Sequence, residues 1–252
     1  MLKNSRNKMF FLISVLFLAA SMVTLAVSVE LSEESNWNLE DLKEVELDSI
    51  NRIYMDLAGA NIFFDENLEN VYMDDELKID RLGSRITISS PNQGLFNIFD
   101  NSDYKIVIGT KNTFRLIDID AGGIILKGKL FADELNIDAG GVNMSGEYYC
   151  ERVNIDGAGM AINAYIETEY LNIDGAGIDL DLEVRGIEDI RIDGVGIDAD
   201  LKYLDKWDGV RHLSINGIGG NFDVRIPDSS SSQNSSLDID SSGIIDTDVV
   251  YY

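Results

Sequence analysis

Residues 171–180 read L-N-I-D-G-A-G-I-D-L, and this stretch decides the fold of the chain. Apolar and polar residues alternate on both sides of a glycine-rich centre. Such alternation is typical of half-buried β-strands, and glycine suits a corner where the backbone turns sharply. The stretch therefore predicts a strand, a corner and a second strand within one short unit.

The centre of this unit, I-D-G-x-G or I-D-A-G-G, returns along the chain. Its acidic positions, at intervals of 18, 18, 18 and 19 residues, are Asp120, Asp138, Asp156, Asp174 and Asp193, with looser copies at Asn216 and Asp240. These intervals are too short for a β-α-β crossover, which needs about 30 residues, and the apolar spacing is not helical. The repeat predicts an all-β fold, a single-stranded parallel β-solenoid (β-helix-like) with coils of 18–19 residues.

Stacking the coils in this register places equivalent residues in columns. One apolar column is predicted to be buried: Ile137, Ile155, Ile173 and Ile192. The acidic column has two interpretations. Each Asp could accept hydrogen bonds from the backbone of the corner that follows it, or the carboxylates could bind cations such as Ca²⁺. The second would be a cation ladder of Asp138, Asp156, Asp174 and Asp193. Because a corner has use for Asp in every coil, we predict no metal and no cofactor.

The N-terminal part of the chain predicts export. Residues 9–27 are nearly all apolar and carry no charge, which is long enough to span a bilayer, and Lys3, Arg6 and Lys8 precede them. We expect residues 1–28 to be a signal peptide or an N-terminal transmembrane anchor, with the rest outside the cytoplasm. The protein would be anchored in the cell membrane through residues 9–27, or secreted if the signal is cleaved.

Composition divides the exported part further. We expect a spacer and then one adhesin-like β-solenoid domain, with irregular N-terminal coils and a cap, regular repeats, and a flexible Ser-rich loop with the last coil. The predicted bounds are 29–45 for the spacer, 46–252 for the domain, and 46–115, 116–226 and 227–252 for its three parts.

Charge and rare residues limit the function. The chain has 45 Asp and Glu against 20 Lys and Arg, a formal net charge of −25, so we predict no nucleic-acid partner. Cys150 is the one cysteine, so no disulfide can form within the chain, and we expect it to serve in packing. The one histidine, His212, is expected at the surface, and zinc-site spacing is absent.

Paired carboxylates are the one catalytic signal. Such pairs can serve glycoside hydrolysis, and here they are Asp118/Asp120, Asp179/Asp181 and Asp198/Asp200. Because the pairs recur from unit to unit, they indicate a surface pattern more than one active site. We therefore predict no catalytic residues and no enzyme, and keep a polysaccharide-active enzyme as an alternative.

Several segments together carry a resemblance to a known family. They read L-K-I at 77–79, R-I-T-I at 85–88, Y-K-I-V-I at 104–108 and L-I-D-I-D-A-G-G-I at 116–124, before the successive I-D-G-x-G corners. Over roughly residues 45–250 the chain resembles the exported bacterial putative-adhesin domains of the GIN and toastrack type. It departs from them in its many Asp residues and in lacking a proline near Gly109.

The resemblance implies a single-stranded parallel β-solenoid and a cell-surface role. We expect a non-enzymatic interaction or adhesin-like module whose partner is a protein or glycan at the cell surface. An alternative is a sensory or regulatory domain of an envelope-stress system that binds a partner protein or an envelope component.

Overall fold

The computed structural model describes residues 38–91, 104–228 and 235–252. The chain divides into two units, 1–37 and 38–252, and only the second is described here. The predicted anchor or signal peptide at 1–28 therefore lies outside the described residues, as does most of the spacer. Within the described ranges, no helix has the length and apolar character needed to cross a membrane.

The described unit is an all-β fold with one 15-stranded sheet. Its single short 3₁₀ helix, η1 (Leu39–Asp41), precedes the first strand. The strands are β1 (Lys43–Val45), β2 (Arg52–Leu57), β3 (Ala60–Asp65), β4 (Val71–Met73), β5 (Lys78–Leu82), β6 (Arg85–Ser89), β7 (Tyr104–Gly109), β8 (Phe114–Ala121), β9 (Ile124–Ala139), β10 (Val142–Gly157), β11 (Met160–Glu167), β12 (Tyr170–Arg185), β13 (Asp189–Tyr203), β14 (Gly209–Ile226) and β15 (Ser235–Tyr251).

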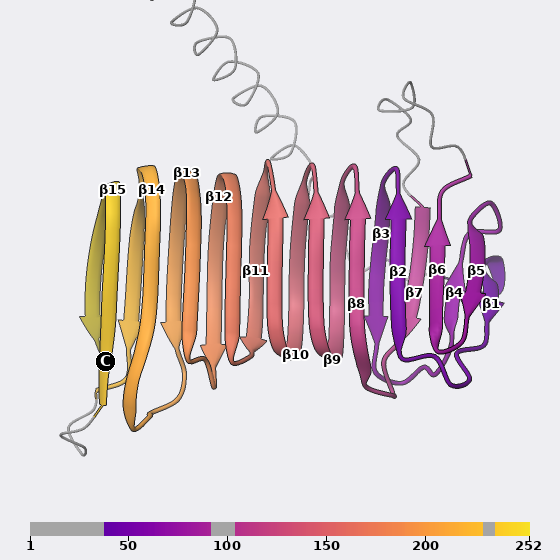
Figure 1. Cartoon of the computed structure of the whole chain (residues 1–252), viewed down its shortest axis with the longest axis horizontal. Helices are drawn as coiled ribbons and strands as arrows, with labels where there is room; N and C mark the ends of the chain where they lie inside the picture. Colours follow the sequence, from indigo (N-terminus) through magenta and orange to yellow (C-terminus); the bar gives the residue numbers. More distant parts are fainter. Residues whose placement is uncertain (1–37, 92–103, 229–234) are drawn as a thin grey trace, which may run out of the picture. The chain divides into compact units, whose positions relative to one another are not determined.

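Successive repeats pair in parallel with equivalent residues opposite each other (Figure 1). The apolar positions alternate along each strand, so one face of every strand turns to a common interior. The predicted column of Ile137, Ile155, Ile173 and Ile192 is confirmed: neighbours in it pair directly, and the residues are 3%, 1%, 0% and 0% exposed. This arrangement is consistent with a β-solenoid.

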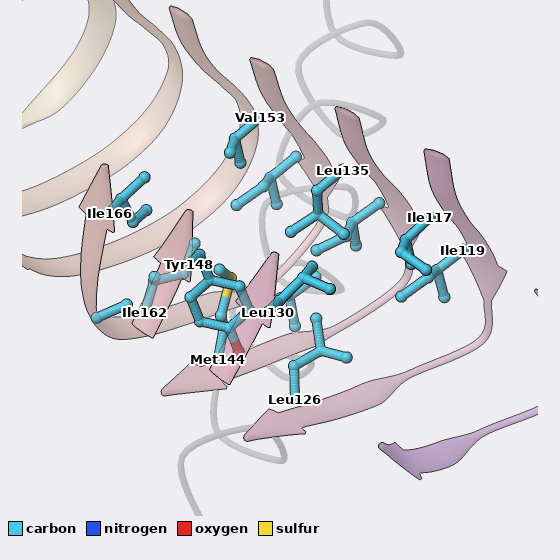
Figure 2. Packing of buried hydrophobic residues seen from close by; sticks show 14 of the residues in the cluster. Ile117, Ile119, Leu126, Leu130, Leu135, Met144, Tyr148, Val153, Ile162 and Ile166 are labelled. Atoms are coloured by element: carbon cyan, nitrogen blue, oxygen red, sulfur yellow. The ribbon is translucent and has the colours of Figure 1, made fainter. Parts of the chain in front are cut away.

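Large side chains fill the interior between the strands (Figure 2). Leu135 stands between Ile117 and Val153 in one column, because β9 pairs with both β8 and β10. Tyr148 is fully buried, meets Phe64 edge to face at 6.3 Å between ring centroids, and donates its hydroxyl to the Ser145 carbonyl at 3.1 Å. The buried ring is therefore accommodated without an unpaired hydroxyl.

Close packing of the coils explains two of the glycine positions. A Cβ on Gly175 would clash with the carbonyl oxygen of Gly157 in the preceding coil. Gly146 has a φ of 118°, and a Cβ there would clash with the Gly128 carbonyl. Only glycine fits where the backbone bends this sharply against its neighbour.

The N-terminal coils do not stack in chain order. β2 lies between β6 and β8, and β3 lies between β7 and β9, all in parallel. The coil formed by β2 and β3 therefore lies inside the stack. The later strands β6 and β7 pair with it on one side, and β8 and β9 pair with it on the other. Three short strands complete this end in antiparallel pairs: β1 with β4, β4 with β7, and β5 with β6. The last pair is a hairpin, since β5 and β6 follow each other in the chain and a turn at Gly83 and Ser84 joins them.

The other end of the sheet is β15, which pairs in parallel with β14. Here the sequence predicts the wrong register, with Asp240 next to Asn216 in the acidic column. Asp240 lies opposite Ser214, and Asn216 faces Ser242, so the last copy of the repeat is shifted by two residues. A two-residue shift keeps every side chain on its own face of the strand, so the apolar pattern cannot distinguish the two registers.

Candidate functional site

The outer face of the coils carries an in-register row of carboxylates, which we call the Asp ladder. Its members pair one with the next across adjacent strands: Asp56, Asp120, Asp138, Asp156, Asp174 and Asp193. Adjacent strands lie about 4.8 Å apart, so these like charges are close neighbours. All are exposed except the half-buried Asp193. The ladder extends the acidic pattern of the sequence one coil further toward the N-terminus, to Asp56.

Burial and neighbouring charges raise the pKa of two carboxylates of the ladder. Partial burial, and then the charges of the adjacent ladder carboxylates, raise the pKa of Asp120 and of Asp156 above the ordinary value for Asp. The pKa of Asp118 is raised by burial and then by the charges of Glu134 and Asp120. Mutual repulsion is therefore a real feature of this face.

Hydrogen bonds donated by the corner N–H groups were expected at the carboxylates of the candidate cation ladder. Among the described residues, no corner N–H donates to Asp138, Asp156 or Asp174, and Asp193 instead accepts from Arg191 Nε at 2.6 Å. The corners bond to each other: Gly140 N–H donates to the Ala121 carbonyl at 3.2 Å, and Val142 N–H to the Gly159 carbonyl at 2.8 Å. Parallel stacking satisfies the corner backbone, so a side-chain cap is not required.

The ladder also does not converge on a point. Within residues 38–91, 104–228 and 235–252, no three His, Cys, Asp or Glu side chains gather closely enough to hold a metal ion. The candidate cation ladder of Asp138, Asp156, Asp174 and Asp193 runs along the sheet, with one carboxylate per strand. That the chain holds no metal or cofactor stays a prediction.

The other paired carboxylates form columns too. Asp179 lies opposite Asp198, and Asp181 lies opposite Asp200, on the strands β12 and β13. Asp200 is held by Arg225 on β14, with 2.6 Å between Nη2 and Oδ2. Each pair of the sequence therefore contributes to two parallel columns on the outside of the sheet.

An aromatic cluster on β9, β10 and β11 was not predicted from the sequence. It consists of Phe131, Tyr149 and Tyr165. The rings of Phe131 and Tyr149 stack at 5.0 Å, and those of Tyr149 and Tyr165 lie 5.6 Å apart. Each ring is half-buried. The available signal was the 18-residue interval between Phe131 and Tyr149, which matches the repeat.

Charged groups surround the aromatic cluster. Lys129 Nζ lies 5.5 Å from the Phe131 ring centre and 5.4 Å from that of Tyr149, and it pairs with Glu66 at 3.1 Å and Glu147 at 3.4 Å. The Tyr149 hydroxyl donates to Glu147 at 2.8 Å. The cluster thus offers ring edges, an ammonium group and carboxylates side by side.

A second unpredicted group joins the longer connection after β13, which carries Asp205 and Trp207, to Arg211 on β14. Arg211 is buried and forms a two-point ion pair with Asp205, at 3.0 Å and 2.6 Å. Its guanidinium lies 4.3 Å from the Trp207 ring centre. Burial acts to raise the pKa of Asp205, but the hydrogen bond and charge of Arg211 outweigh it and the pKa is lowered. This group closes the connection against the sheet and serves stability.

The remaining candidate residues lie where the sequence indicated. Cys150 is buried, and burial raises its thiol pKa to about 12, so it stays protonated and serves in packing. His212 is exposed on β14 and faces Asp238 of β15, with 3.6 Å between Nδ1 and Oδ2. In the described part of the chain, neither residue belongs to a group of three or more His, Cys, Asp or Glu side chains that could hold a metal ion.

Comparison with known proteins bears on the fold. No family model matches the chain, and no curated protein matches it. A crystal structure described as a putative adhesin from Bacteroides fragilis is similar, with a TM-score of 0.50 at 12% identity over 82% of this chain and 96% of that one. A crystal structure described as a putative cell adhesion protein from Clostridium sporogenes has a TM-score of 0.32 at 15% identity, over 84% of this chain and 100% of that one. The first similarity confirms, at the level of the fold, the resemblance to putative-adhesin domains.

Proposed function

We propose that the protein is a non-enzymatic, adhesin-like interaction module that is exported and acts at the cell surface. The observation that carries the proposal is the arrangement of the outer face, where polar and aromatic side chains stand in rows along the sheet. Rows of this kind present many equivalent contacts to a long partner, whereas catalysis needs groups that converge on one reacting atom. The fold shared with a putative adhesin supports the same conclusion.

The aromatic cluster is the part of this face that we assign to contact. Tyrosine rings combine apolar area with a polar hydroxyl, and this combination is enriched where proteins bind partners. Here Tyr149 and Tyr165 present hydroxyls that donate to Glu147 and Glu167, next to the ammonium group of Lys129. We propose a protein or a glycan of the cell surface as the partner.

Export and attachment belong to the same proposal. Residues 9–27 would hold the chain in the membrane if they are not removed, and the described unit would then stand outside the cytoplasm. Protease added to intact spheroplasts should digest the unit at 38–252. Digestion that occurs only after the spheroplasts are lysed would contradict this location.

The binding test uses the full-length chain, purified in detergent and immobilised, with envelope extract separated into protein and glycan fractions. One variant carries Phe131→Ser, Tyr149→Ser and Tyr165→Ser. The matched control is Tyr170→Ser, which removes a 36% exposed ring elsewhere on the sheet. We expect the triple variant to capture at least about tenfold less of the bound component, since it loses several buried ring contacts. The control should capture as much as the original chain.

Two results would contradict the proposal. Equal capture by the triple variant would remove the aromatic cluster from the contact surface. Release of reducing sugars from envelope polysaccharide, lost in Asp118→Asn or Asp179→Asn, would instead identify the protein as an enzyme. Thermal unfolding of each variant, followed by circular dichroism, establishes that any change in capture does not come from loss of the fold.

A further inference from the structure

Strand β15 is a long strand that forms one edge of the described sheet. Strands β9 to β14 have a neighbour on each side, whereas β15 pairs with β14 alone and extends over 17 residues. An unpaired strand edge presents a row of free N–H and C=O groups that can accept another strand. At the opposite end of the sheet, short antiparallel strands complete the fold.

The interior is also open beside β15. Leu213 and Val224 on β14 are 1% and 0% exposed. Their partners on β15, Ile239 and Val249, are half-buried and pack against the same core from one side only. Three further apolar side chains nearby are strongly exposed: Ile244 at 75%, Val250 at 51% and Tyr251 at 64%. Apolar area therefore accompanies the free backbone groups, mainly along residues 244–251.

The outer face of the same segment carries two carboxylates beside the exposed Val250. Asp246 and Asp248 are exposed and alternate with the inward Ile245 and Val249. On the β14 side Asp248 faces another carboxylate, Asp223. In this register β14 therefore places no basic side chain opposite Asp248.

Elsewhere the sheet shows how such carboxylates are balanced. Lys202 lies opposite Glu183 in register and pairs with it at 2.7 Å, and Lys129 pairs in register with Glu147 at 3.4 Å. A cation on the adjacent strand is thus one of two arrangements in this sheet, and the other is the row of like charges in the Asp ladder. An added strand with basic residues opposite Asp246 and Asp248 would form the attractive arrangement at β15.

We propose that residues 244–251 of β15 bind an extended segment of a partner protein as an additional strand. In that segment apolar residues alternate with Lys or Arg, so that one face covers Ile245 and Val249 and the other neutralises Asp246 and Asp248. Strand addition of this kind takes its affinity from main-chain hydrogen bonds and its specificity from alternate side chains. A second copy of this chain pairing the same segment would set carboxylates against carboxylates. The contact is at the end of the stack and does not depend on the aromatic cluster.

The probe is a seven-residue peptide of alternating valine and lysine, blocked at both ends and labelled for fluorescence anisotropy. It is titrated into the full-length chain in detergent. We expect saturable binding that weakens as salt is added, together with slower hydrogen exchange of the β15 amides. A peptide with glutamate in place of lysine, and one with N-methylated backbone amides, should both fail to bind.

Matched variants locate the contact. Asp246→Asn with Asp248→Asn should weaken binding of the lysine peptide at least about tenfold, since two charge pairs are lost. Asp179→Asn with Asp198→Asn removes the same charge from β12 and β13, which both have strands on either side, and should bind as the original chain does. The Phe131→Ser, Tyr149→Ser, Tyr165→Ser variant should also bind the peptide normally, even if it loses envelope capture.

Three results would overturn the proposal. One is binding of the glutamate or N-methylated peptide as strong as that of the lysine peptide. Another is equal weakening by the variant at Asp179 and Asp198, which would reduce the interaction to general charge attraction. The third is a dimer in sedimentation that protects the β15 amides without any peptide, which would make a second copy the occupant.

Discussion

The two ends of the sheet are built on the same columns but are finished differently. One column runs through the interior from β6 to β15: Ile86, Ile53, Ile117, Leu135, Val153, Leu171, Ile190, Leu213 and Ile239. Ile53 has Ile86 on one side and Ile117 on the other, and it is fully buried. Ile239 has a neighbour on the β14 side only and is half-buried. In a stacked architecture, the contribution of a residue to stability thus depends on its neighbours more than on its type.

The largest expected effect tests this difference directly. Ile53→Ala should lower the free energy of unfolding by about 2–5 kcal/mol, because it leaves a cavity between two coils. Ile239→Ala, in the same column, should cost about 1 kcal/mol, since much of its apolar area already faces solvent. Urea unfolding of the full-length chain measures both. Equal losses would mean that the end of the sheet at β15 is covered in solution.

A second comparison sets a buried ion pair against an exposed one near the open end. Arg211→Met should cost about 2 kcal/mol, because it leaves the carboxylate of Asp205 without its main partner. The control is Arg191→Met, whose guanidinium is 61% exposed in its pair with Asp193, and which should cost under about 1 kcal/mol. Similar costs in urea unfolding would show that Asp205 relaxes into water once Arg211 is removed.

The lowered pKa of Asp205 predicts a pH dependence of the same region. A carboxyl with a lower pKa in the folded state contributes stability that is fully present above its ordinary pKa of about 3.9. That contribution is lost as the pH falls through the lowered folded value. The free energy of unfolding, measured from pH 6 downward, should therefore decline more steeply for the original chain than for Asp205→Asn. Parallel curves would show that the pair with Arg211 gives no net stability.

The smallest expected effect concerns the Asp ladder and has the opposite sign. Because the pKa of Asp156 is raised in the folded state, its contribution to stability improves as the pH falls through the folded value toward the ordinary one. Asp156→Asn removes the repulsion at neutral pH and should leave stability unchanged or raise it by under about 0.5 kcal/mol. A clear loss of stability would mean that the carboxylate has a bonding role after all.

The sequence predicted the regular coils well because two signals agree there. Alternation fixes which face of a strand is buried, and a constant interval fixes which residues pair, as for Ile155 with Ile173. At Asp240 the interval changes and alternation alone allows either register. The place of β2 between β6 and β8 has no periodic signal at all. The corner role predicted for Asp138 was wrong, because only the stacked backbone shows that the corner after it bonds to the neighbouring corners.

The position of β2 and β3 between strands that follow them in the chain has a consequence for folding. β2 and β3 are made early but obtain their neighbours late, since one side waits for β6 and β7 and the other for β8 and β9. Closing these long loops is the costly part of assembly, and local pairing cannot replace it. The later coils add one after another to a template that already exists. The residues around β2 are thus expected to form the slow nucleus, and the coils beyond β9 to follow by elongation.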